Sequence, residues 1–340
     1  MRSLTNKQAG HANEEYDINR ESEGRGDAEG AGRDTCAANI AVVRRFFGAV
    51  ETPGDPKASV PEGQFAPTDS GGRMVSPILV TGGTGTLGRH VVRRLREAGR
   101  DIRVLSRHQH ASGDGIEYVS GDLLRCEGIE PAVDGAEIIV HCAGDNKGDE
   151  EATGNLVGAA SRAGAQHFVY ISVIGADRIP IVSGIDRTMF GYFASKLGAE
   201  RIVANSGLRW TTLRAAQFHD FILTAAQQMA KLPIIPVLAG FRFQPVDPNE
   251  VAGQLVNLTL GAPTGLVPAM GGPRIYGMAD LLRAYLRARG KRRMIVPLWI
   301  PGKAARAFRA GANIAPERAV GHRTWEDFLV ARVSSRGDTI

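Results

Sequence analysis

Residues 78–88 read ILVTGGTGTLG, and this stretch decides the fold. The apolar run at 78–80 predicts a short buried strand, and the glycine-rich turn after it leads into a helical stripe that ends at Gly99. Residues 102–105 predict the next strand. A strand, a glycine-rich turn and a helix in this order are the setting that the dinucleotide-binding fingerprint requires. The apolar positions of the stripe are Leu87, Val91, Val92, Leu95 and Ala98.

The glycines of this turn have separate physical roles. Gly82 permits the tight turn, Gly85 lets the backbone approach a pyrophosphate, and Gly88 lets the helix pack close to the strand. The free N–H groups at the start of the helix then attract the phosphates. The residues that we expect to contact the cofactor here are Gly82, Thr84, Gly85, Thr86, Leu87 and Gly88.

The residues after the second predicted strand favour NADPH over NADH. NAD-binding versions place an acid about 20 residues beyond the glycines, where it binds the ribose 2′-hydroxyl. Here that region holds Arg107, preceded by Ser106, and Arg89 adds a second cation directly after the glycines. An arginine fork and a hydroxyl suit a 2′-phosphate. The alternative is that Arg107 is only a solvated loop residue.

Short apolar strands alternate with helices further along the chain, which indicates an α/β fold with a doubly wound, Rossmann-like parallel sheet. Ligands of such sheets lie along the carboxyl ends of the strands. The further predicted strands are 116–119, 137–140, 167–173 and 210–213.

Four residues at these strand ends are predicted to contact the cofactor. Asp122 and Leu123 follow one strand and are expected near the adenine, whereas Ala143 and Gly144 follow the next strand and are expected near the cofactor backbone. The residues at 141–142, His-Cys, lie on a buried strand, so we expect them to be packing residues rather than a reactive pair.

Composition excludes several classes of protein. No run of about 18 apolar residues exists, so no membrane-spanning helix is expected. Three widely spaced cysteines without a CxxC pair argue against a disulfide framework or a zinc cluster, and they fit the cytoplasm. Lysines and arginines mix with acids up to about residue 281, so we predict no nucleic-acid partner.

The chain divides into an acidic head and a basic body. Residues 1–73 hold 9 Lys and Arg against 12 Asp and Glu, and the remaining residues hold 32 against 24. The head is polar and rich in glycine and proline, so we expect it to be mostly disordered, with one short helix at 38–50.

The body, over roughly residues 77–330, resembles the short-chain dehydrogenase/reductase superfamily, in its atypical NmrA-like branch of NAD(P)H-binding proteins. TGGTGTLG has the TGxxGxxG form of extended and atypical members. The later markers are FGYFASKLGAERIVANSGLRWTTLRAAQFHDF, FQPVDPNEVAG and GHRTWEDFL. The resemblance implies a dinucleotide-binding core at 74–206 and a smaller substrate-binding part at 207–340 that completes the same domain.

The resemblance also implies a catalytic group. The superfamily uses a Tyr-x-x-x-Lys pair on a helix and a serine at the end of the fifth strand, and Tyr192, Lys196 and Ser172 match this pattern. Lys196 would lower the pKa of the Tyr192 phenol and bind the nicotinamide ribose. Tyr192 would donate a proton to a carbonyl oxygen that Ser172 holds, while hydride reaches the carbon.

These residues predict an NADPH-dependent reductase of a hydrophobic carbonyl compound or quinone. Two alternatives stay open. Some members of the branch are regulators that sense NADP(H) without turnover, and sugar-nucleotide epimerases share the glycine loop.

Beyond Ser206 the predictions concern the substrate and the surface. Gln217, Phe218 and His219 are candidate substrate contacts, although His219 can equally be a core residue. The apolar stretch 231–247 suggests a wall of the substrate cleft. The stretch 281–310 holds nine cations and no acid, so it is either a membrane-surface patch or a solvated helix face. The sequence does not indicate the oligomeric state.

Overall fold

The structure, a computed structural model, describes residues 76–144 and 148–334. The head at 1–73 and its predicted helix at 38–50 lie outside these residues. Among the described residues, no helix combines the length and the apolar character needed to cross a membrane.

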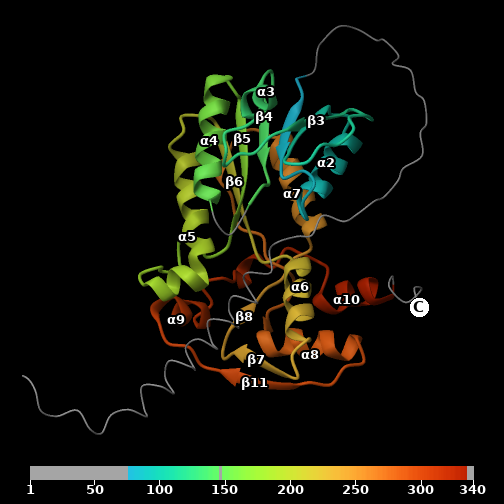
Figure 1. The fold of residues 1–340 in the computed structure, drawn as a ribbon, viewed down its shortest axis with the longest axis vertical. Coiled ribbons are helices and arrows are strands. Elements are labelled where there is room, and N and C mark those ends of the chain that lie inside the picture. Colours follow the sequence, from blue (N-terminus) through green and yellow to red (C-terminus); the bar gives the residue numbers. More distant parts are fainter. Residues whose placement is uncertain (1–75, 145–147, 335–340) are drawn as a thin grey trace, which may run out of the picture. The chain divides into compact units, whose positions relative to one another are not determined.

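A seven-stranded sheet, in which every neighbouring pair is parallel, confirms the predicted doubly wound α/β class (Figure 1). From β1 the chain continues through β2 and β3 to one edge of the sheet, and it then returns to the other side of β1 with β4 and continues toward the opposite edge. Folds of this class form a ligand crevice at such a switch point, here between β1 and β4. The predicted strands agree with the observed ones to within two residues. In order across the sheet, the strands are β3 (Ile116–Ser120), β2 (Ile102–Ser106), β1 (Ile78–Thr81), β4 (Ile138–His141), β5 (His167–Val173), β6 (Trp210–Ala215) and β9 (Gly265–Leu266).

Helices cover both faces of the sheet. On one face, α2 (Gly88–Glu97) and α7 (Pro248–Leu260) share an apolar core with the strands. On the other face, α3 (Ile129–Val133), α4 (Asp149–Arg162) and the second half of α5 (Gly184–Ala204) do the same. With both faces covered, β1 and β5 are buried along their whole length rather than at alternate positions.

A second group of elements, which we name the C-terminal lobe, has its own apolar core (Figure 1). Phe241 and Phe243 are 1% and 0% exposed, and Phe241 stacks on Phe308 with ring centroids 4.8 Å apart. The prediction of a cleft wall at 231–247 is therefore wrong for these two rings, because they fill the lobe's core. The elements are α6 (His219–Met229), β7 (Ile234–Leu238), β8 (Arg242–Phe243), β10 (Tyr276–Gly277), α8 (Met278–Ala288), β11 (Met294–Leu298), α9 (Lys303–Arg309), the 3₁₀ helix Pro316–Arg318 and α10 (Trp325–Ser334).

Helix α5 belongs to both cores. Phe190 and Phe193, in its first half, pack in the lobe, whereas Ala199 and Val203 pack against the sheet. The helix starts with a capping box, in which Ser183 Oγ accepts from the Asp186 amide and the Asp186 carboxylate accepts from the Ser183 amide. Tyr192 and Lys196 lie near the middle of α5, and the helix therefore holds them at the junction of sheet and lobe.

His219 is a core residue. The sequence leaves this possibility open beside the predicted role as a substrate contact. It is 0% exposed, and its ring stacks on Phe328 with centroids 5.0 Å apart. Neither ring nitrogen has a hydrogen-bond partner within the described part of the chain. Burial lowers the pKa of His219 to about 4 from its ordinary 6.5.

We expect this histidine to make the fold sensitive to acid. The unfolded chain takes up the proton near pH 6.5 but the folded chain only near pH 4, so stability falls as the pH drops through this window. The loss attributable to His219 is on the order of 3 kcal/mol at pH 4. His219→Phe should remove that part of the loss, as measured by urea unfolding at pH 7, 5.5 and 4.5. The exposed His322, changed to Phe, is the matched control, and equal pH dependence in both variants would contradict the expectation.

Candidate active site

The glycine loop lies where β1, β4 and the start of α2 meet. Gly82 has a φ of +67°, and a Cβ there would lie 2.6 Å from the Ala143 amide nitrogen. A Cβ on Gly88 would lie 2.0 Å from the Gly82 carbonyl oxygen. Only glycine fits at these two positions. At Gly85 the nearest atom is that same carbonyl oxygen, at 3.2 Å, so the loop leaves this side open.

The start of α2 fits an anionic group. The residue before the helix is Leu87, no side chain of the described residues caps the helix, and its first turn has no acid. The Arg89 and His90 amides donate to the Gly85 and Leu87 carbonyls, so a ligand here would use the Leu87 and Gly88 N–H groups, which bond no backbone group of the described residues, and the positive end of the helix dipole. This arrangement, beside an open Gly85, fits the pyrophosphate of a dinucleotide.

The residues expected around the rest of the cofactor lie at the neighbouring strand ends. Arg107 directly follows β2, is exposed, and has no ion pair with any described residue. Asp122 follows β3, and its Oδ1 accepts from the Leu124 amide at 2.9 Å. Arg89, the second cation, is half exposed and approaches Asp220 at 4.0 Å. Their predicted contacts with a cofactor stay predictions.

The ammonium of Lys196 is buried in an ion pair. Its Nζ lies 3.1 Å from Asp149 Oδ2, and the two side chains are 3% and 1% exposed. Nζ also donates to the Tyr170 hydroxyl and to the Ile171 carbonyl, each at 3.2 Å. The Tyr170 hydroxyl in turn donates to Asp149 Oδ2 at 2.8 Å. An ammonium has three donors, and these three protein groups engage all of them.

This network sets the charge state of the site. Burial alone would lower the pKa of Lys196, but Tyr170, the Asp149 carboxylate and Tyr192 outweigh it and raise that pKa well above its ordinary value. Lys196 is therefore protonated at neutral pH. Gly144, one of the predicted cofactor contacts, lies beside it, since a Cβ on Gly144 would be 3.1 Å from Nζ.

Tyr192 is half-buried, and two opposing effects act on the pKa of its phenol. Lys196 Nζ lies 5.9 Å from the centroid of the Tyr192 ring and acts to lower the phenol pKa, as expected. Burial has the larger effect, and the pKa of Tyr192 is raised. The sequence shows the charge four residues away but not the desolvation, which outweighs it.

Two other candidate residues carry buried polar atoms without partners. Ser172, near the end of β5, is 4% exposed, and its Oγ has no hydrogen-bond partner in the described residues. The same holds for both amide atoms of Gln217, which follows β6. Buried polar atoms are normally satisfied, so these are atoms that a ligand can engage. Phe218, beside Gln217, is half-buried.

Sequence reasoning missed Asp149 and Tyr170. Asp149 begins α4 together with two further acids, and acids at a helix start are ordinary because they favour the helix dipole. Tyr170 lies inside a strand that is buried along its whole length. A phenol in such a strand needs a partner, and this was the available signal.

His141 and Cys142 are packing residues, as predicted. His141 is 0% exposed, its ring nitrogens contact the hydroxyls of Thr81 and Thr153, and burial lowers its pKa to about 4. Burial raises the pKa of Cys142 to about 12, so the thiol is not a nucleophile at neutral pH.

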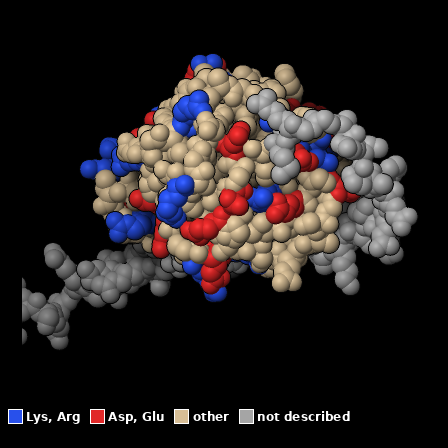
Figure 2. Space-filling view, turned by 90° about the horizontal axis from the view of Figure 1, so that it is seen from above, with Lys and Arg blue, Asp and Glu red and all other residues tan. Residues whose placement is uncertain are grey.

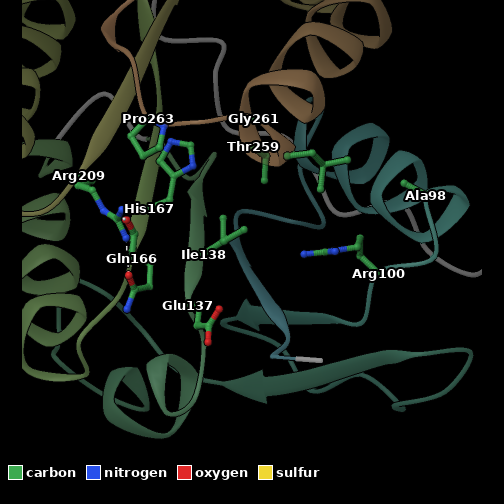
Figure 3. A pocket seen from close by; sticks show the side chains of 11 residues that line it. Ala98, Arg100, Glu137, Ile138, Gln166, His167, Arg209, Thr259, Gly261 and Pro263 are labelled. Atoms are coloured by element: carbon green, nitrogen blue, oxygen red, sulfur yellow. Dashed lines mark hydrogen bonds between the residues drawn. The ribbon is translucent and has the colours of Figure 1, made fainter. Parts of the chain in front are cut away.

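A cavity of about 370 Å³ lies away from these residues (Figure 3). Glu137, Gln166 and Arg209 line it, and each of them precedes a strand of the sheet. Arg209 donates to the Gln166 carbonyl at 3.1 Å. The cavity is thus at the amino ends of the strands, the edge opposite to the one where parallel sheets bind their cofactors.

Comparison with known proteins agrees with the dinucleotide assignment. Residues 82–231 match a family model described as NAD(P)H-binding. Over 202 residues, the chain is 29% identical to (4-alkanoyl-5-oxo-2,5-dihydrofuran-3-yl)methyl phosphate reductase of Streptomyces griseus, an alignment that covers 58% of this chain and 68% of that protein. It is 28% identical over 244 residues to ceramide reductase of Caulobacter vibrioides, covering 66% and 74%. Alignments to two further curated relatives span 56% and 32% of those proteins.

Solved structures give the same fold. The structure of the NADPH-dependent quinone oxidoreductase QOR2 of Escherichia coli, complexed with NADPH, matches with a TM-score of 0.63. The match covers 75% of this chain and 99% of that chain at 18% identity. At this identity the likeness shows the fold.

We expect the Asp149–Lys196 pair to be strongly coupled. Asp149→Asn or Lys196→Met should each cost about 3 kcal/mol or more, because each leaves a buried charge alone. Asp149→Asn/Lys196→Met should lose clearly less than the sum of the single variants. Urea unfolding of the four proteins measures the coupling. The exposed pair Glu130–Arg162, at 3.0 Å, is the control and should couple by less than about 1 kcal/mol. Additive losses at Asp149 and Lys196 would contradict the expectation.

Proposed function

We propose that residues 82–231, which match a family model described as NAD(P)H-binding, form a domain of the atypical short-chain dehydrogenase/reductase type, in its NmrA-like branch, and that the protein is an NADPH-dependent oxidoreductase. Its substrate is a hydrophobic small molecule, and the group reduced is a carbonyl or a quinone oxygen. Relatives with the printed names ceramide reductase and quinone oxidoreductase support this substrate class.

The unpartnered hydroxyl of Ser172 carries the proposal. Ile171, the residue before it, accepts from Lys196, so the end of β5 is fixed against α5 one turn away from Tyr192. A substrate oxygen between Ser172 and Tyr192 would satisfy the buried hydroxyl. Leaving such a group without a partner costs about 1–3 kcal/mol, which favours an oxygen-bearing ligand at this place.

Tyr192, Ser172 and Lys196 have different roles in the proposed reduction of a carbonyl group. Bound NADPH would supply a hydride to the substrate carbon. Tyr192 stays protonated at neutral pH because burial raises its pKa, and it donates its proton to the substrate oxygen. Ser172 donates a hydrogen bond to the same oxygen. The ammonium of Lys196, 5.9 Å from the Tyr192 ring, stabilises the negative charge that develops on the phenol oxygen.

The cofactor preference rests on Arg107. Its guanidinium is exposed at the end of β2 and free of ion pairs with the described residues, so it can bind a 2′-phosphate bidentately. QOR2, which shares the fold, was solved with NADPH.

One observation favours a second function, that of a regulator which binds NADP(H) without turnover. The three donors of Lys196 are engaged by Tyr170, Ile171 and Asp149. A contact with the nicotinamide ribose would have to replace one of these bonds. If it does not, the dinucleotide binds at the glycine loop but is not aligned for hydride transfer.

Turnover separates the two functions. We expect steady oxidation of NADPH in the presence of quinones or aryl ketones, measured by absorbance, and a fall in kcat of about 100-fold or more in Tyr192→Phe. Tyr276→Phe is the control, because that phenol binds Glu326 at 2.6 Å in the lobe, and its kcat should stay within about twofold. Tight binding of NADPH by calorimetry without turnover over a broad panel would instead support the regulator.

Arg107→Ala tests the cofactor. Loss of a bidentate phosphate contact should raise the Kd for NADPH by about tenfold or more and leave the Kd for NADH nearly unchanged. Arg162→Ala, an exposed arginine on α4, controls for the loss of one positive charge. A variant that keeps the preference for NADPH would show that another group recognises the 2′-phosphate.

A further inference from the structure

The C-terminal lobe has an exposed band of cations around β11. One of them is in the last turn of α8, four lie between α8 and β11, and two follow on α9. All are exposed, and none forms an ion pair with a described residue. We name this set the basic rim: Arg287, Arg289, Lys291, Arg292, Arg293, Lys303 and Arg306.

Exposed apolar side chains lie at both ends of β11. Met294 and Ile234 are register partners at the start of β11 and β7, and they are 61% and 50% exposed. Trp299, directly after β11, is 63% exposed. The Arg309 guanidinium lies 4.8 Å from the centroid of the Trp299 ring. Large apolar side chains are thus mixed with the cations.

Seven of the nine cations at 281–310 belong to the basic rim, whereas the three leucines predicted to lie among them on the surface are buried. Leu281, Leu282 and Leu286 are 1–4% exposed, because that face of α8 packs in the lobe's core. Arg283 pairs with Asp280 at 2.8 Å. The face open to a partner is therefore the edge of β11 with its flanking residues, not the leucines.

The charge of the basic rim selects the kind of partner. β11 pairs only with β7 in its two-stranded sheet, so its other edge carries no strand among the described residues. A second copy that paired there would bring seven like charges against seven. An anionic surface has no such penalty. A nucleic acid would neutralise the cations but would give Met294 and Ile234 no apolar environment.

We propose that the basic rim, with Met294, Ile234 and Trp299, docks the C-terminal lobe on the surface of an anionic lipid bilayer. The cations bind lipid phosphates, and the apolar side chains enter the boundary between headgroups and acyl chains. Tryptophan is favoured at this depth because its ring is amphipathic. By contrast, the face of the molecule seen from above in Figure 2 carries acidic side chains interspersed with basic ones, a pattern that does not favour docking on an anionic bilayer. The proposal goes beyond the proposed function and does not depend on turnover.

Vesicle binding by the full chain, without cofactor, tests the proposal. We expect co-sedimentation with vesicles of equal parts phosphatidylglycerol and phosphatidylcholine, none with phosphatidylcholine alone, and at least tenfold weaker binding at physiological than at low salt. Lys291→Ala/Arg292→Ala/Arg293→Ala should weaken binding by about 100-fold, since each surface cation contributes about a factor of five. The control removes three exposed arginines outside the lobe, Arg125→Ala/Arg162→Ala/Arg201→Ala, and should change binding by less than about fivefold.

Trp299 gives a second readout. Trp325 is 0% exposed, and Trp210 is half-buried at the start of β6, in the sheet and outside the lobe, so a blue shift of tryptophan fluorescence on vesicle addition should come mainly from Trp299 and vanish in Trp299→Phe. Trp299→Ala should also weaken binding by about tenfold. Three results would overturn the proposal: equal effects of the two triple variants, binding to poly(U) RNA but not to vesicles, or self-association that the rim variant abolishes.

Discussion

The site depends on one buried ion pair. Asp149 and Lys196 are almost completely removed from water, and either charge alone would be costly there. Together with the Tyr170 hydroxyl and the Ile171 carbonyl, the pair joins the start of α4, the strand β5 and the helix α5. Ser172 is one residue beyond this junction on β5, and Tyr192 is one helical turn before it on α5. The ion pair therefore fixes the two elements that carry the proposed proton donor Tyr192 and Ser172, the proposed binder of the substrate oxygen.

The elements of the sheet could be predicted because their signals are local. Short apolar runs predict the strands, and the steric need for glycine at Gly82 and Gly88 follows from a turn of eight residues. The cofactor end of the site follows from the same rule, since the carboxyl ends of parallel strands meet at one edge. Arg107 and Asp122 accordingly lie at the ends of β2 and β3.

The rest of the site could not be predicted because it depends on burial and on contacts between distant segments. The spacing of Tyr192 and Lys196 is visible in the sequence, but the carboxylate that binds Lys196 comes from another helix. The raised pKa of Tyr192 has the same origin, since desolvation outweighs the neighbouring charge. His219 follows a strand, as a cleft residue would, yet α10 covers it with Phe328. In the stretch 281–310, leucines of α8 are buried in the lobe's core because that face of the helix is turned inward. Met294 and Trp299, at the two ends of the edge strand β11, are exposed.

Helix α5 holds the site residues in fixed positions between the core of the sheet and the core of the lobe. Its rigid geometry fixes Tyr192 relative to Lys196, and the bond from Lys196 to Ile171 fixes both relative to β5. Neither relation requires a loop, and sites built on helices and strands hold their geometry better than sites on loops. Phe190 and Phe193, on the same helix, anchor the lobe's core beside Tyr192. The surface of the lobe can therefore vary while the arrangement of phenol, ammonium and serine hydroxyl is held from the side of the sheet.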